Sequence, residues 1–252
     1  GSSWTNGAIL VVGSRDDGTL RIENGGQVSN TDGVIGSQSG STGTATVYGE
    51  SSTWHNSGTL TVGDQGDGAL TIESGGRIEN TFGRIGLDDP SGIGFDGAGI
   101  VMVTDADSIW DNSEQLYVGV EGPGTLTIAD GGSVENTDGV LAQFSRATGT
   151  VTVTGPAATW SNSGTLTVGD QGEGTLTIES GGGVENMDAS VGLMPDSIGS
   201  VTVRGSGSSW ISNATLSIGA TSPGCGTCGT AQVTVQAGAM VSVTQDTALN
   251  LD

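Results

Sequence analysis

Five tryptophans recur along this chain at nearly constant intervals. Successive positions are separated by 50, 56, 50 and 50 residues in a chain of 252 residues. A fixed period of this length is the sequence signature of a repeat protein, in which similar units stack along one axis. The single longer interval includes residues 87–99, which carry a six-residue insertion. The five residues are Trp4, Trp54, Trp110, Trp160 and Trp210.

Each of these units divides again into two coils of about 25 residues. One coil offers three short strand segments, represented by residues 59–62, 69–72 and 78–80. Alternation with a period of two places apolar side chains on one face of each strand and polar side chains on the other. Parallel stacking at about 4.8 Å per coil then predicts an all-β, right-handed parallel β-helix of about nine coils with three strands each. We expect residues 1–252 to form one such domain, as a fragment of a longer protein.

The third segment of each coil carries an apolar residue and, two positions later, an asparagine. The apolar residue alternates between tryptophan and valine or isoleucine, so a large side chain would lie over a small one in neighbouring coils. The asparagines would form a buried ladder that pairs amide to amide and caps backbone groups of the turn. We therefore expect both sets to be structural. The asparagines are Asn6, Asn30, Asn56, Asn80, Asn112, Asn136, Asn162 and Asn186.

The charge of the chain is strongly acidic, with 28 acidic residues against 6 basic ones and no lysine. Phosphate contacts require clustered cations, so nucleic acid is an unfavourable partner. The same repulsion disfavours anionic membrane surfaces. The sequence holds neither an apolar run of about 18 residues nor a leader peptide, so we expect no membrane insertion of this chain and an export signal outside it.

The two cysteines, Cys225 and Cys228, lie in a Gly-Cys-Gly-Thr-Cys-Gly segment. Short disulfides, redox motifs and half of a zinc site share this spacing. The chain has no second cysteine pair and only one histidine, His55, which disfavours zinc. We expect a local disulfide formed after export, with free thiols as the alternative.

Residues 57–76 are repeated almost verbatim at 163–182, and a Trp-x-Asn-Ser-Gly pattern occurs at 54–58 and 160–164. These segments closely resemble the passenger repeats of Gram-negative autotransporters, and the resemblance covers essentially the whole chain. It implies a β-helical passenger that is exported through its own C-terminal outer-membrane barrel to the bacterial surface or the medium. It also implies a role in adhesion, aggregation or biofilm formation, and it brings no catalytic residues.

Acidic turns between the first and second strands raise the question of a bound cation. Calcium takes about six to eight oxygen ligands, whereas each turn offers two carboxylates. A solvated negative edge is therefore the simpler interpretation of these turns. The best single candidate for a calcium site is the insertion, which contains Asp88, Asp89 and Asp96. No other cofactor is expected.

The most variable turns all fall at the corner between the first and second strands, at 37–43, 87–99, 143–149, 193–199 and 220–229. Repeat proteins usually keep the scaffold constant and vary the surface that meets a partner. We therefore predict that this variable corner contacts a host or bacterial surface protein or glycan, with drift in loops that touch nothing as the alternative. The candidate contact residues are Asp88, Asp89, Phe95, Asp96, Phe144, Arg146 and Met194.

Two other functions remain open at this point. One is a polysaccharide-active β-helix enzyme: a lyase needs a basic group near a calcium-binding carboxylate cluster, and a hydrolase needs carboxylates from neighbouring coils about 5 to 9.5 Å apart. Neither group is evident in the sequence, so we expect no enzymatic activity. Outward threonine pairs such as Thr150 and Thr152 resemble the display of ice-binding β-helices, although Ile100 and Met102 interrupt the array. Unpaired strand edges at the coil ends also predict end-to-end or side-to-side self-association.

Overall fold

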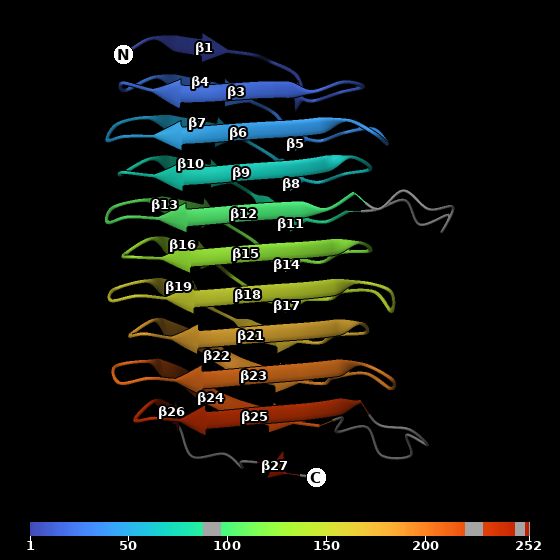
Figure 1. Cartoon of the computed structure of the whole chain (residues 1–252), viewed down its shortest axis with the longest axis vertical. Helices are drawn as coiled ribbons and strands as arrows, with labels where there is room; N and C mark the ends of the chain where they lie inside the picture. Colours follow the sequence, from blue (N-terminus) through green and yellow to red (C-terminus); the bar gives the residue numbers. More distant parts are fainter. Residues whose placement is uncertain (88–96, 220–228, 245–249, 252) are drawn as a thin grey trace.

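The protein is a column of stacked β-strands, seen in a computed structural model that describes residues 1–87, 97–219, 229–244 and 250–251 (Figure 1). The described residues include no helix, and hence none that could cross a membrane. Every strand pairing given for them is parallel, as in the predicted solenoid. In Figure 1 the front strands run from right to left and the chain returns behind them as it descends, which makes the coil right-handed.

One sheet contains the second strand of every coil. It has nine strands, which bound about eight full turns. Its members pair in register, so that equivalent residues of successive coils lie side by side. The strands are β3 (Gly18–Glu23), β6 (Thr42–Tyr48), β9 (Asp67–Glu73), β12 (Gly99–Thr104), β15 (Pro123–Ala129), β18 (Thr148–Thr154), β21 (Glu173–Glu179), β23 (Ile198–Arg204) and β25 (Thr230–Gln236).

The other sheet has 18 strands and contains the first and third strands of the coils as two ladders. The two long strands β22 and β24 run through both ladders and join them, so in these coils the third strand continues into the next first strand without a break. The first-strand ladder is β2 (Leu10–Val12), β5 (Gly33–Ile35), β8 (Thr59–Val62), β11 (Phe82–Ile85), β14 (Leu116–Val118), β17 (Gly139–Leu141), β20 (Thr165–Val168) and β27 (Asn250–Leu251). The third-strand ladder is β1 (Ser3–Thr5), β4 (Gln27–Asn30), β7 (Thr53–Asn56), β10 (Arg77–Asn80), β13 (Ile109–Asn112), β16 (Ser133–Asn136), β19 (Thr159–Asn162), β22 (Gly183–Val191), β24 (Ser209–Ile218) and β26 (Met240–Val243).

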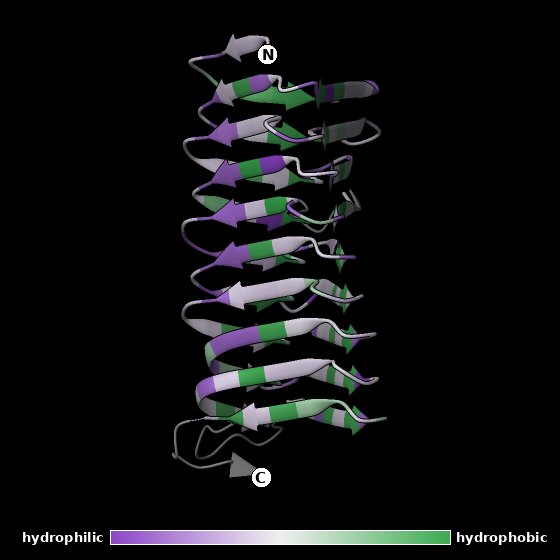
Figure 2. Cartoon of the chain, turned by 90° about the vertical axis from the view of Figure 1, so that its left-hand side faces the viewer, coloured by the Kyte–Doolittle hydropathy of each residue, from purple (hydrophilic) through white to green (hydrophobic). Residues whose placement is uncertain are grey.

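The core is a continuous column of inward side chains from all three ladders. Leucine, isoleucine and valine alternate with outward polar residues along most strands, which gives the banding visible in Figure 2. Four of the five tryptophans, Trp54, Trp110, Trp160 and Trp210, are fully buried. Trp4 departs from the prediction, since 50% of it is exposed, because it lies in the first strand of the stack with no coil above it.

The asparagines do not form the continuous amide ladder that the sequence predicts. They join coils in pairs, and the tryptophan takes part. Trp160 Nε1 donates to Asn136 Oδ1 of the preceding coil at 2.7 Å, and Asn136 Nδ2 donates to Asn162 Oδ1 at 2.6 Å. The same arrangement links Trp54, Asn30 and Asn56, and Trp110, Asn80 and Asn112. We call each such pair of coils a Trp–Asn unit.

The asparagine side chains make longer hydrogen bonds between successive Trp–Asn units than within them. Asn112 Nδ2 reaches the backbone oxygen of Glu135 at 3.3 Å, and Asn162 Nδ2 reaches that of Glu185 at 3.4 Å. Asn56 Nδ2 has no partner among the described residues although the side chain is buried. Asn6, in the uncovered first coil, instead bonds locally to the backbone oxygen of Ile9 at 3.1 Å. The ladder is therefore segmented at every second coil.

Glycines make room for the indole rings. A Cβ on Gly139 would lie 2.7 Å from Trp160 Cζ2 and 2.5 Å from Asn162 Oδ1. A Cβ on Gly33 or Gly83 would lie 3.0 Å from Cζ2 of the tryptophan of the next coil, and 2.7 or 2.4 Å from Oδ1 of its asparagine. These three glycines are therefore required by close packing, while the indole covers the space that a side chain would otherwise fill.

The last Trp–Asn unit departs from the other three at two positions. Ala189 replaces the glycine, and Ser212 takes the asparagine position, where it accepts from Asn186 Nδ2 at 2.9 Å. Asn213, the next residue along the chain, lies outside the core at a register shift and donates to Glu185 Oε1 at 2.8 Å. In this unit the ladder residue Ser212 is smaller than asparagine, and the residue beneath the indole, Ala189, is larger than glycine.

Candidate binding surfaces

The variable corner runs down one side of the column, at the right-hand edge in Figure 1. It connects the first and second ladders, as in β5 to β6 and β17 to β18. Phe144 and Met194 are 40% and 43% exposed at this corner, and Arg146 is also exposed. The remaining predicted contact and cation residues and both cysteines lie outside the described residues; they are Asp88, Asp89, Phe95, Asp96, Cys225 and Cys228.

Three of the longer turns at this corner share one backbone arrangement. The amide of Ala147 donates to the oxygen of Phe144 at 2.9 Å, and the same three-residue bond closes the turns that begin at Gln38 and Met194. The closing residue is buried in each case, as Ser41, Ala147 or Ser197. Alternate coils therefore present different exposed side chains on the same rigid turn.

Two carboxyl groups lie half-buried at the same corner. Asp64 and Asp170 each follow the glycine that comes directly after β8 or β20. Burial raises the pKa of both carboxyls above the ordinary value, because the charged form loses contact with water. Their ionisation is therefore less favourable in the folded chain than in the unfolded chain.

We expect the double substitution Asp64→Asn/Asp170→Asn to raise the melting temperature near pH 7. A raised folded-state pKa stabilises the fold only while the carboxyl is protonated, and this contribution is lost as the pH rises through the folded-state pKa. The advantage of the variant should shrink on acidification and vanish below about pH 4, where the unfolded-state carboxyls are protonated too.

Melting curves across this pH range measure that difference, with Asp16→Asn, an exposed side chain of the same corner, as the control. A variant whose melting temperature is lower than that of the parent near pH 7 would contradict this interpretation.

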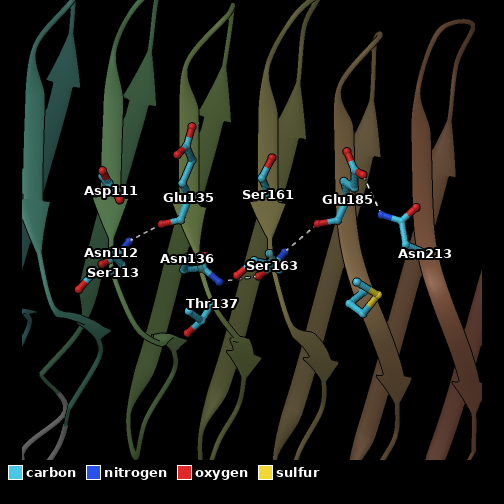
Figure 3. A pocket seen from close by; sticks show the side chains of 12 residues that line it. Asp111, Asn112, Ser113, Glu135, Asn136, Thr137, Ser161, Ser163, Glu185 and Asn213 are labelled. Atoms are coloured by element: carbon cyan, nitrogen blue, oxygen red, sulfur yellow. Dashed lines mark hydrogen bonds between the residues drawn. The ribbon is translucent and has the colours of Figure 1, made fainter.

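A long polar groove follows the corner between the third strand of one coil and the first strand of the next. Two open hollows of about 540 and 450 Å³ lie along this groove and have Asp111 and Ser113 in common, so they are neighbours on the surface. Figure 3 shows Asp111, Glu135, Ser161 and Glu185 side by side on successive strands along one wall. The groove is not evident from the sequence.

The wall of the groove is a single row set by the strand register. Glu79 pairs with Asp111, Asp111 with Glu135, Glu135 with Ser161, and Ser161 with Glu185. These are the outward residues between the core residue and the ladder asparagine of each coil. Like charges directly opposite each other in a sheet are unfavourable, so this row concentrates negative charge.

Arg77 neutralises only the upper end of the row. Its Nε contacts Glu79 Oε1 at 2.6 Å and its Nη2 contacts Asp111 Oδ2 at 2.9 Å. The hydrogen bond from Arg77 is the main cause that lowers the pKa of Glu79, and His55, 3.3 Å away, acts in the same direction. Glu135 and Glu185 have no ion pair among those found in the described part of the chain.

The outward face of the nine-stranded sheet carries two columns of mostly uncharged residues. Thr125, Thr150 and Thr175 are in register in one column, and Thr127 and Thr152 belong to the other. Ile100 and Met102 lie in the same two columns, between these threonines and Thr44 and Thr46 of an earlier coil. Both side chains are exposed, so they interrupt the threonine array as the sequence indicates. The ice-binding hypothesis stays a prediction.

Within the described residues, no group of three or more histidine, cysteine or acidic side chains is arranged to hold a metal ion. The acidic row along the groove therefore differs from a coordination site, because its members are spread along the axis and not gathered around one point.

No protein-family profile and no curated protein sequence matches the chain. Among solved structures, the chain is similar to "Crystal structure of TibC-catalyzed hyper-glycosylated TibA55-350 fragment", with 19% sequence identity over 86% of this chain and 80% of that chain and a TM-score of 0.24. A similarity of this size carries no argument about function.

Proposed function

We propose that the chain is a non-catalytic adhesive column, surface-exposed or secreted in the manner of an autotransporter passenger, which contacts its partner through the variable corner. The observation that supports this proposal most is the shared turn that begins at Gln38, Phe144 and Met194. Its backbone is constant while the exposed side chain changes from polar to aromatic to thioether. Such a combination suits a surface selected for what it contacts.

The rigidity of the column gives these side chains fixed spacing. Phe144 and Met194 begin turns that are two coils apart, which corresponds to about 9.6 Å at about 4.8 Å per coil. Aromatic residues, methionine and arginine are enriched in protein–protein interfaces, and Arg146 lies on the same turn as Phe144. We therefore expect the partner to span at least two coils.

The proposal predicts that the triple substitution Phe144→Ser/Arg146→Ser/Met194→Ser lowers cell–cell or cell–surface adhesion several-fold. The physical reason is the loss of the side chains that would be desolvated in the contact. Adhesion of cells or beads that display the chain provides the measurement, and circular dichroism verifies that the strands are retained.

The matched control is Tyr48→Ser/Arg21→Ser/Met102→Ser, which removes an aromatic, a basic and a thioether side chain from the face of the nine-stranded sheet. It should leave adhesion close to that of the parent chain. Equal losses in both variants, or a folded corner variant that adheres normally, would contradict a role for the variable corner.

A further inference from the structure

The interfaces between successive coils have similar backbone pairing but different side-chain bonds. The strands of the nine-stranded sheet pair in register from coil to coil, as β15 does with β18 and β18 with β21. The backbone ladders therefore contribute about equally to every interface. Because each coil contacts only its neighbours, the side chains decide which interfaces are the stronger ones.

A second set of hydrogen bonds joins the same pairs of coils as the indoles do. In three of the four Trp–Asn units, a serine two positions before the tryptophan accepts from a turn glycine of the preceding coil. In the third unit Ala158 takes the place of this serine. The bonds join Gly25 N to Ser52 Oγ at 3.1 Å, Gly75 N to Ser108 Oγ at 3.0 Å and Gly181 N to Ser208 Oγ at 3.0 Å.

Aspartates at the next corner of the coil repeat this pairing. Thr59 N donates to Asp32 Oδ1 at 2.8 Å, and Thr165 N donates to Asp138 Oδ1 at 2.8 Å. Each aspartate comes two residues after the first ladder asparagine of its unit, and each threonine comes three residues after the second. Bonds at two corners therefore join the same pairs of coils as the buried indole does.

We call the interface between two successive Trp–Asn units a junction. At the first junction, the described residues leave the buried Asn56 Nδ2 without a partner. The short bond there, from Thr81 Oγ1 to Ser57 O at 2.9 Å, is exposed to water. The other side-chain bonds at the junctions are longer. They are His55 to Glu79 at 3.3 Å, Asn112 to Glu135 O at 3.3 Å, Gln115 to Asp138 at 3.2 Å and Asn162 to Glu185 O at 3.4 Å.

From this alternation of strong and weak interfaces we infer that the column unfolds under tension in two-coil steps, each of which releases one Trp–Asn unit. A force that pulls on the two ends of the chain peels coils from the ends of the stack. When the bonds inside a unit break, its second coil is held only by the weaker junction and follows at the same force. The column would then lengthen under load in steps while the remaining units stay folded. The inference goes beyond the proposed adhesive role and does not depend on it.

Single-molecule pulling of the whole chain, held by handles at its two ends, tests this inference. The buried tryptophans are separated by 56, 50 and 50 residues. A unit of 50 residues releases about 180 Å of extended chain and removes about 10 Å of column, so we expect increments of about 170 Å. The unit that carries the six-residue insertion should give an increment about 20 Å longer, which identifies it in the traces.

The variant Trp160→Phe removes an indole donor and keeps a ring in the core, in the unit that lacks the serine bond. We expect it to split the increment of this unit into two of about 85 Å each. Trp4→Phe is the matched control, since Trp4 lies outside the four units and is 50% exposed. The control should leave the increments unchanged. Circular dichroism verifies that both variants keep their strands.

Two results for the parent chain alone would overturn the inference, whatever the fate of the variants. Increments of about 85 Å throughout would mean that every coil unfolds alone. One increment for the entire column would mean that the junctions are as strong as the interfaces inside the units. Unchanged increments in a folded Trp160→Phe would also contradict it, because the Trp–Asn bond would then not couple the coils. Pulling involves no binding partner, so its outcome is independent of the adhesion experiment.

Discussion

Replacing Trp110 with alanine is expected to lower the free energy of unfolding by about 3–5 kcal/mol. The indole is fully buried and its Nε1 donates to Asn80 Oδ1 at 2.8 Å. Its removal leaves a cavity between two coils and deprives Asn80 Oδ1 of the indole donor. Because each coil contacts only its neighbours, the defect should weaken the stack most at this point.

Urea denaturation followed by circular dichroism measures this loss, and hydrogen exchange locates it. Trp4→Ala is the matched control, since half of Trp4 is exposed and no coil lies above it. The control should shift the transition far less than Trp110→Ala. Similar shifts for both variants would show that the tryptophans do not stabilise the stack through coil-to-coil packing.

The second prediction concerns the space beneath an indole. Gly139→Ala should destabilise the chain by about 1–3 kcal/mol, because the new Cβ would approach both Trp160 and Asn162 within 2.7 Å. Adding Asn162→Ser should recover part of this loss. The last Trp–Asn unit already combines Ala189 with Ser212 at the equivalent positions, and its indole remains fully buried.

A double-mutant cycle measures this compensation. Asn162→Ser alone should also destabilise the chain, since it weakens the link to Asn136 that is 2.6 Å long in the parent. The coupling between the two substitutions should be favourable by about 0.5–3 kcal/mol. Strict additivity would mean that Ala189 is tolerated for a reason other than the size of Ser212.

The sequence predicted the parallel β-helix because the repeat places equivalent residues one coil apart. Period-two alternation identified the inward residues Leu60, Val62, Leu70 and Ile72, all of which are buried. It did not reveal the pairing of coils into Trp–Asn units. Whether an indole donates to the asparagine above or below depends on the direction of the side chain, which a repeat pattern does not contain.

The candidate surfaces differ in how visible they are in the sequence. The variable corner appears as a departure from the repeat, so Phe144 and Met194 were identified as exposed positions there. The groove consists of regular repeat positions, and Glu135 and Glu185 looked like ordinary outward residues of a strand. A column-by-column comparison of the residues between the core residue and the asparagine would have shown the acidic row, but not the concave surface beside it.

The sequence by itself therefore determined the solenoid, its period and the side of each strand that faces the core, since these follow from hydrophobic periodicity alone. Only the tertiary structure decided which coils bond as pairs, that Ser212 takes the ladder position in the unit that contains Ala189, and where the surface is hollow. Those features depend on the angles at which strands meet and on contacts between side chains about 25 residues apart. Hydrophobic periodicity specifies neither of them.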